Sequence, residues 1–132
     1  MMEEMYTEVI LDYYRNPKNF GTIENPDIQA RDTNPLCGDV IEMQLKLNGN
    51  GTIEQVRFSG KGCAISLAAA SMLTENIEGK SLEEIQRIGK EDVLDMLGIQ
   101  VSAVRLKCAL LGLKVLKLGT YSFLGKQMEE EL

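Results

Sequence analysis

A chain of 132 residues is long enough to bury a hydrophobic core but too short for two ordinary domains, so we expect one domain over residues 1–132. Its formal net charge of −6 argues against nucleic acid as a partner, because phosphate binding needs a basic surface. The sequence contains no histidine, which excludes Cys-His and Ser-His-Asp catalysis and zinc sites with imidazole ligands.

The first residues, Met1-Met2-Glu3-Glu4, include acidic residues where a signal peptide has basic ones, and no apolar run follows them. No segment approaches the ~18 uninterrupted apolar residues of a membrane span. Three cysteines are an odd number, unlike the disulfide framework of a small secreted protein. We therefore expect a cytoplasmic chain with reduced thiols and no membrane partner.

The first half of the chain predicts one helix followed by strands. Apolar residues at helical spacing predict a helix over residues 5–14, and residues 28–33 are compatible with a short strand. Strict alternation predicts a half-buried strand over residues 40–47. The turn at residues 48–51 then leads into a strand over residues 53–59. Such short connections predict antiparallel pairing, because parallel strands need a long crossover.

The second half of the chain predicts helices. Residues 63–77 are apolar around most of a helical circumference, so this helix should lie deep in the domain. Ser81 and Glu84 form a capping-box pattern for a short helix, and residues 91–97 predict another, which Gly98 ends. Strands followed by helices predict an α+β domain, a three-stranded antiparallel sheet with helices packed on one face.

A longer helix is predicted over residues 102–118, and a polar, acidic tail with frayed ends over residues 125–132. The apolar stripe expected on the buried face of this helix consists of Val104, Cys108, Leu111, Val115 and Leu118.

Cys63 stands where the deep helix begins, directly after Gly60-Lys61-Gly62. The two glycines permit turn conformations that other residues avoid. The positive end of the helix dipole and the nearby Lys61 both favour the thiolate, which is the form that binds metal or attacks sulfur. The alternative for this stretch is an inert cysteine at the base of a core helix.

The three cysteines, Cys37, Cys63 and Cys108, contain no CxxC pair, yet each lies at or near the end of a predicted element. Asp39 follows Cys37 across one glycine. Three thiolates and a carboxylate would make a four-coordinate site for zinc, or for two irons bridged by sulfides. Taken singly, Asp39 could be a turn residue and Cys108 a core residue.

Two basic residues beside the third cysteine, Arg105 and Lys107, are most simply solvated helix charges. They could instead favour the Cys108 thiolate or lie over the site, as modulators alongside Lys61.

The contexts of the cysteines resemble the NifU-like family of iron–sulfur cluster scaffolds, which includes the IscU and SufU branches. The resemblance covers almost the whole chain and has the SufE/NifU-like fold as its implied architecture. It rests on residues 9–17 (VILDYYRNP), 34–39 (NPLCGD), 60–66 (GKGCAIS), 78–82 (EGKSL) and 105–109 (RLKCA).

The resemblance implies a scaffold or carrier rather than an enzyme, with no catalytic residues. A cysteine desulfurase would deliver persulfide sulfur, iron would be added, and a [2Fe-2S] cluster would assemble and pass to apo iron–sulfur proteins. An iron donor or a chaperone could take part, and the chain could act as a homodimer or within a hetero-complex. The implied ligands and sulfur acceptors are Cys37, Cys63 and Cys108, and Asp39 would be the fourth ligand or control cluster release.

The chain departs from both branches of the family. IscU proteins typically have histidine where this chain has Lys107, and an amine is a much poorer ligand than imidazole, which favours Asp39 as the fourth ligand. Residues 101–105 align with the proline-containing chaperone motif of IscU but lack both prolines. The cysteine contexts look more like SufU, although the insertion that SufU carries between its second and third cysteines is missing.

Two alternatives to the scaffold function stay open. In a SufU-like sulfurtransferase, zinc would organise the same four residues, and one cysteine would leave the zinc to accept persulfide. In a metal-free interaction domain, the three cysteines would be incidental core residues.

Overall fold

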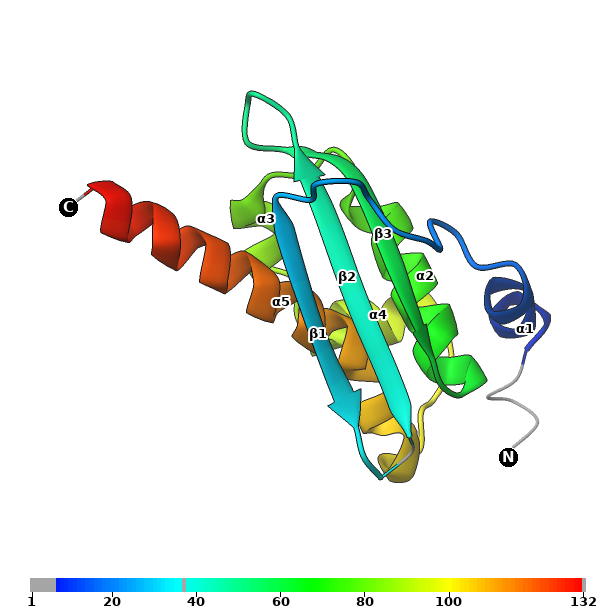
Figure 1. Ribbon diagram of the computed structural model, residues 1–132. Coiled ribbons are helices and arrows are strands. Elements are labelled where there is room, and N and C mark those ends of the chain that lie inside the picture. The colour runs from blue at the N-terminus through cyan, green and yellow to red at the C-terminus, as the bar shows by residue number, and fades with distance from the viewer. Residues whose placement is uncertain (1–6, 37, 132) are drawn as a thin grey trace.

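The computed structural model describes residues 7–36 and 38–131, with side chains as far as Gly125. Eight elements follow one another along the chain (Figure 1). They are α1 (Glu8–Arg15), β1 (Ile28–Asn34), β2 (Asp39–Leu47), β3 (Ile53–Lys61), α2 (Ala64–Ile77), α3 (Leu82–Gln86), α4 (Lys90–Leu97) and α5 (Ala103–Glu131).

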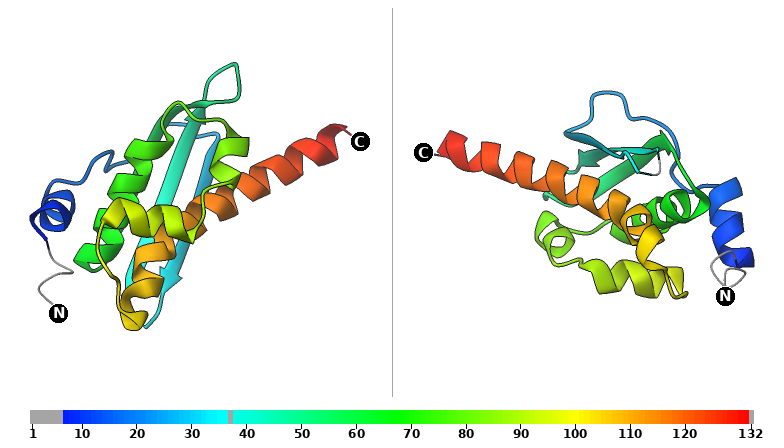
Figure 2. Two further views of the ribbon diagram at one scale, coloured as in Figure 1. Left: turned by 180° about the vertical axis from the view of Figure 1, so that it is seen from behind. Right: turned by 90° about the horizontal axis from the view of Figure 1, so that it is seen from below.

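The three strands form one antiparallel sheet in the order β1-β2-β3. Helices α2 and α5 pack against one face of this sheet, with α3 and α4 beyond them (Figure 2). The predicted α+β architecture, with three antiparallel strands and helices on one face, is confirmed.

The alternation in β2 places Ile41, Met43 and Leu45 on the helix side, where all three are buried. Val56 and Phe58 of β3 are paired with Leu45 and Met43 and are buried on the same side, as predicted. This apolar face is the surface on which α2 and α5 pack, and its burial is the main favourable term in forming the domain.

The outer edge of β3 is paired rather than open. The backbone N–H of Phe58 donates to the carbonyl of Asn19, and the N–H of Gly21 donates to the carbonyl of Phe58. The rings of Phe20 and Phe58 meet edge to face, with centroids 5.3 Å apart. The segment that follows α1 therefore protects an edge that could otherwise pair with another chain.

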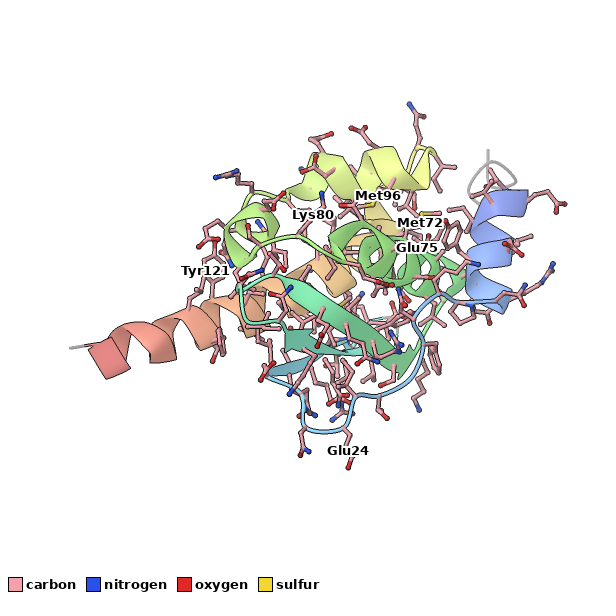
Figure 3. The ribbon with its side chains drawn as sticks, turned by 90° about the horizontal axis from the view of Figure 1, so that it is seen from above. Glu24, Met72, Glu75, Lys80, Met96 and Tyr121 are labelled. Carbon is pink, nitrogen blue, oxygen red and sulfur yellow. The ribbon has the colours of Figure 1, made fainter. Side chains whose placement is uncertain are left out.

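Helix α1 packs on α2, where the Tyr13 hydroxyl donates to the Glu75 carboxylate at 2.6 Å. Because neutral tyrosine is the donor, this contact raises the pKa of Tyr13. A hollow between these helices and α4 is lined by Met72, Glu75 and Met96, labelled in Figure 3. Helix α1 itself begins at Glu8 behind the Thr7 cap, whereas the predicted start at residue 5 lies outside the described residues.

The short connecting helices follow their predicted signals. Ser81 and Glu84 form the capping box at the start of α3, with both reciprocal hydrogen bonds present. Gly98 ends α4 in the left-handed conformation, at φ +66°.

Helix α5 is longer than predicted at its C-terminal end. It continues to Glu131, so the expected frayed tail over residues 125–132 is wrong as far as residue 131. Residues 126–131 contain no proline and are strong helix formers, and their charge did not interrupt the helix. Figure 1 shows this part of α5 projecting beyond the sheet.

The predicted buried stripe of α5 is correct only in its middle. Cys108, Leu111 and Val115 are buried, but Val104 and Leu118 are 76% and 52% exposed. Gly112 lies on the buried face, where a Cβ would come within 3.3 Å of Ala70, so α5 approaches α2 closely at this point. The packing surface of α5 therefore includes Gly112 and leaves some of the apolar residues of the helix exposed.

Within Ala103–Gly125 of α5, an 18-residue window meets the length and composition requirements of a membrane span, with a mean hydropathy of 1.2. Half of this window is buried within the fold, so packing on the sheet and α2 accounts for its apolar character.

Candidate metal site

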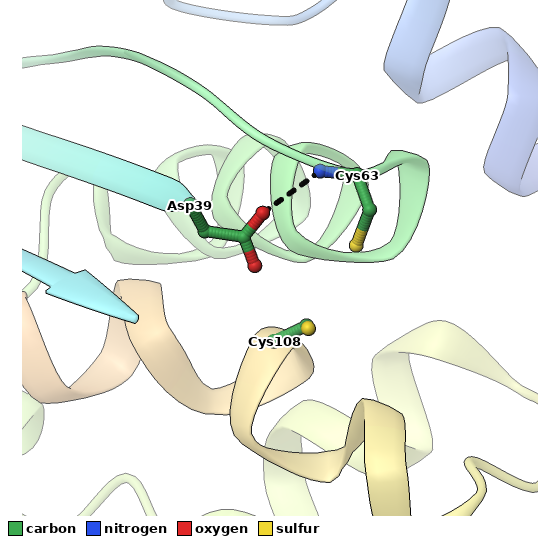
Figure 4. A group of neighbouring side chains, drawn as sticks. All are labelled: Asp39, Cys63 and Cys108. Carbon is green, nitrogen blue, oxygen red and sulfur yellow. Dashed lines mark hydrogen bonds between the residues drawn. The ribbon is translucent and has the colours of Figure 1, made fainter. Parts of the chain in front are cut away.

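Three of the four predicted ligands converge from three different elements (Figure 4). Asp39 is the first residue of β2, Cys63 directly precedes α2, and Cys108 lies near the start of α5. One carboxylate oxygen and the two sulfur atoms all lie within 4.8 Å of one another. A single small inorganic centre can therefore contact all three side chains.

The start of α2 is capped by Asp39 from the neighbouring strand. Cys63 is the N-cap residue, but its own side chain makes no capping hydrogen bond. Instead, Asp39 Oδ1 accepts a hydrogen bond from the backbone N–H of Cys63 at 3.0 Å, the dashed line in Figure 4. A carboxylate at this position satisfies one of the unpaired N–H groups of the helix and interacts favourably with its dipole.

Gly62 makes this contact sterically feasible. A Cβ at residue 62 would overlap Asp39 Oδ1 and the hydroxyl oxygen of Ser66. The sequence-based explanation, a turn, is wrong for Gly60, which lies within β3 and is paired with Ile41, although its φ of +141° is a conformation that other residues avoid. At Gly62 the requirement is instead the close approach of the Asp39 carboxylate and the Ser66 hydroxyl.

The two carboxylate oxygens of Asp39 differ in their hydrogen bonding. Its side chain is 0% exposed, and Oδ2 is buried without a hydrogen-bond partner among the described residues. An unpartnered buried carboxylate oxygen is costly unless a cation or a donor meets it. The sulfur atoms of Cys63 and Cys108 lie close to this carboxylate, and sulfur is a ligand that zinc and iron–sulfur centres use. The three residues therefore fit such a group.

The two described thiols differ in exposure and surroundings. Cys63 is half-buried, whereas Cys108 is 0% exposed. The side-chain amide of Asn34 donates to Cys108 Sγ at 3.7 Å. Neither Asn34 nor the steric role of Gly62 was predicted from the sequence, since an asparagine before a proline already has an ordinary explanation in a turn.

Cys37 lies outside the described residues, so its part in the site stays a prediction. Its neighbours Leu36 and Gly38 belong to the hairpin between β1 and β2, and Gly38 N–H donates to the carbonyl of Asn34 at 2.9 Å. Asn34 and Asp39 face each other in the strand register and so fix the base of this hairpin.

The predicted basic modulators occupy three different places. Lys61 is paired with Val40 and lines a hollow with Arg31 and Glu42 on the sheet face opposite Asp39, so it does not join the thiols. Lys107 is exposed and lines a hollow between the end of β1 and α5. Arg105 is half-buried, and its backbone N–H donates to Ser102 at the start of α5.

Comparison with known proteins identifies the family of the chain. The family model described as the NifU-like N-terminal domain matches residues 5–130. The iron–sulfur cluster assembly scaffold protein IscU of Escherichia coli K12 is 34% identical over 125 residues, which cover 92% of this chain and 96% of the relative. The zinc-dependent sulfurtransferase SufU of Bacillus subtilis 168 is 37% identical over 135 residues, covering 89% and 90%.

Solved structures share the same architecture. FiSufU from Fervidobacterium islandicum AW-1 superimposes with a TM-score of 0.76 at 28% identity, covering 88% of this chain and 96% of that one. A NifU-like N-terminal protein from Brucella abortus gives a TM-score of 0.80 at 19% identity, covering 95% and 98%, and supports the fold alone. By its sequence over residues 5–130, this chain belongs to the NifU-like N-terminal domain family.

Proposed function

We propose that this chain is a scaffold on which a [2Fe-2S] cluster is assembled from iron and desulfurase-derived sulfur and is then passed to apo-proteins. The observation that carries the proposal is the convergence of Asp39, Cys63 and Cys108, with the buried Asp39 Oδ2 left without a partner among the described residues. The relative named as an IscU scaffold, 34% identical over most of both chains, supports the same function.

In this proposal the cluster is cargo, held by the thiolates of Cys37, Cys63 and Cys108 and by Asp39. Asp39 Oδ1 is already committed to the N–H of Cys63, which leaves Oδ2 as the ligand atom. A carboxylate is a harder ligand than a thiolate and holds a soft iron–sulfur centre less firmly. A mixed ligand set of this kind suits a carrier, which must let its cargo go.

Sulfur delivery is a thiol exchange in this scheme. A thiolate of the scaffold attacks the terminal sulfur of the desulfurase persulfide, and the desulfurase cysteine leaves as a thiolate. Each transferred sulfur needs two electrons to become sulfide, and an electron-transfer protein would supply them. The chain then acts as a carrier rather than an enzyme, with a cysteine desulfurase and apo iron–sulfur proteins as its cytoplasmic partners.

The second candidate function is zinc-dependent sulfur transfer. The relative named as a zinc-dependent sulfurtransferase is 37% identical over nine-tenths of this chain, and zinc accepts the same sulfur and carboxylate donors. In that case the metal would be a resident ion that arranges the thiols, and persulfide rather than a cluster would leave the protein.

Anaerobic reconstitution distinguishes the two functions. The protein is purified without oxygen, analysed for iron, zinc and acid-labile sulfide, and then supplied with iron, sulfide and a thiol reductant. Visible [2Fe-2S] absorption at stoichiometric iron is the result expected for the scaffold. Zinc that survives purification and prevents iron uptake would favour sulfur transfer instead.

A third outcome would remove both functions. If the protein takes up neither iron nor zinc, and a thiol reagent modifies none of its cysteines in the native state, they are inert core residues.

A further inference from the structure

We propose that Asn34 is a positioning residue of the metal site, whose side-chain amide orients the Cys108 sulfur and withdraws charge from it. This inference rests on the proposed function, because it requires a metal or cluster bound through Cys108. Asn34 donates a hydrogen bond to the ligand atom Cys108 Sγ and does not contact the metal or cluster itself.

The position of Asn34 fits this role. It is the last residue of β1, 7% exposed, and lies opposite Asp39 in the strand register. Its Nδ2 donates to Cys108 Sγ at 3.7 Å across 74 residues of sequence. One residue therefore links the strand that precedes the Cys37 hairpin to the ligand on α5.

The donor matches a charged sulfur better than a neutral one. The amide nitrogen of asparagine can only donate, and a thiol sulfur is a weak acceptor. A thiolate accepts more strongly, because hydrogen bonds to ionised groups are the stronger kind. Hydrogen bonds to the sulfur ligands of a metal orient them and tune the electronic properties of the centre.

The backbone and the side chain of Asn34 have separable roles. The carbonyl of Asn34 accepts from the N–H of Gly38 and helps to close the hairpin. A substitution at residue 34 keeps the carbonyl that accepts this bond and removes the side-chain donor to sulfur. Loss of the side-chain amide therefore tests positioning without deleting the hairpin contact.

Cobalt(II) is the probe, because thiolate-to-cobalt charge-transfer bands report directly on the electron density of the bound sulfur. Cobalt is titrated anaerobically into the metal-free wild-type protein and into Asn34→Leu, which has a similar volume and no donor. Asn34→Asp keeps the shape but replaces the donor with an acceptor. Thr33→Ala, at the exposed neighbouring position, is the matched control.

We expect the charge-transfer band to move to lower energy in Asn34→Leu and further in Asn34→Asp, while Thr33→Ala matches the wild type. Cobalt affinity should fall by about 10-fold in Asn34→Leu, the lower end of losses seen when a partner of a metal ligand is removed. Thermal unfolding of each variant establishes whether it is folded. If Asn34→Leu is not folded, the band energy of Asn34→Asp tests the inference.

Two results would overturn the inference, and they are distinguishable. If the wild type shows thiolate-to-cobalt bands and the folded Asn34 variants show the same energies, Asn34 does not tune the sulfur, and the proposed function stands. If the wild type shows no such bands at all, the cysteines do not bind the metal, and both the proposed metal site and the role of Asn34 are wrong.

Discussion

Asp39 of the predicted site is hydrogen-bonded to Cys63, the N-cap residue of helix α2. One carboxylate oxygen accepts the backbone N–H of Cys63 at 3.0 Å, and the other is buried without a partner among the described residues. A single side chain can thus cap α2 and bind a metal at the same time. Substitutions at residue 39 should consequently separate these two roles.

Asp39→Ala is expected to retain a reconstituted cluster longer than the wild type does. Under the proposed function Asp39 is the hard ligand, which would dissociate either on protonation or when a stronger ligand binds, so release would begin there. The measurement is the rate of cluster transfer to an apo-ferredoxin, followed by visible circular dichroism. Transfer from the variant that is as fast as from the wild type would contradict this role for Asp39.

Asp39→Asn should leave the metal-free protein at least as stable as the wild type. The amide oxygen can still accept from Cys63, a cap whose loss typically costs about 1 kcal/mol, and the buried charge is gone. Added zinc should raise the melting temperature of the wild type more than that of Asp39→Asn. Weakening the affinity about 10-fold would remove about 1.4 kcal/mol of the metal-dependent stabilisation.

The companion variant Asp39→Ala serves as the control for capping. It lacks both the ligand and the acceptor, so it should be less stable than Asp39→Asn without metal. Equal metal-free stability of these two variants would show that the hydrogen bond to Cys63 does not contribute to stability.

The sheet and the deep helix could be predicted because their signals are local. Alternation through Ile41, Met43 and Leu45 gives the buried face of β2, and the apolar circumference of α2 gives its depth. Helical spacing in α5 correctly predicted which side of the helix is buried, but it did not predict how far along the helix the buried face extends. Val104 and Leu118 were therefore wrongly assigned to the buried face.

The convergence of the site could not be derived from spacing. Asp39 and Cys63 are 24 residues apart, and only the pairing of β2 with β3 brings them together. The family resemblance implied this grouping where periodicity could not. The contact between Asn34 and Cys108 depends on where α5 crosses the end of β1, which no local pattern of residues specifies.

Gly62→Ala should disturb the site through sterics alone. The new methyl group would overlap Asp39 Oδ1 and the Ser66 hydroxyl, so the carboxylate must move away from Cys63. We expect a loss of about 1–3 kcal/mol in the free energy of unfolding, the usual cost of overpacking, together with weaker zinc binding. Gly49→Ala is the matched control, because a Cβ at residue 49 would have no heavy atom of another residue within 4 Å beyond its chain neighbours. Zinc affinity as high in Gly62→Ala as in Gly49→Ala would contradict the steric argument.

The ion pair between Asp32 of β1 and Lys114 of α5 gives a prediction for acid stability. The Lys114 ammonium lies 2.8 Å from the Asp32 carboxylate and, together with the backbone N–H of Thr33, holds the pKa of Asp32 below its ordinary value. Because the pKa is lower in the folded state, this contribution is fully present above the unfolded-state pKa of about 4 and is lost as pH falls through the folded value.

At neutral pH, Asp32→Asn should therefore reduce the free energy of unfolding by about 0.5 kcal/mol, the scale of an exposed ion pair. The difference from the wild type should shrink towards zero below pH 4, once the wild-type carboxylate is protonated. Urea unfolding at a series of pH values measures it, with Glu54→Gln on the exposed face of β3 as the control. Added salt should also reduce the difference at neutral pH, since exposed pairs are screened. A difference that stays constant from pH 7 to pH 3 would mean that the carboxylate charge is not its cause, and that the substitution acts through packing between β1 and α5.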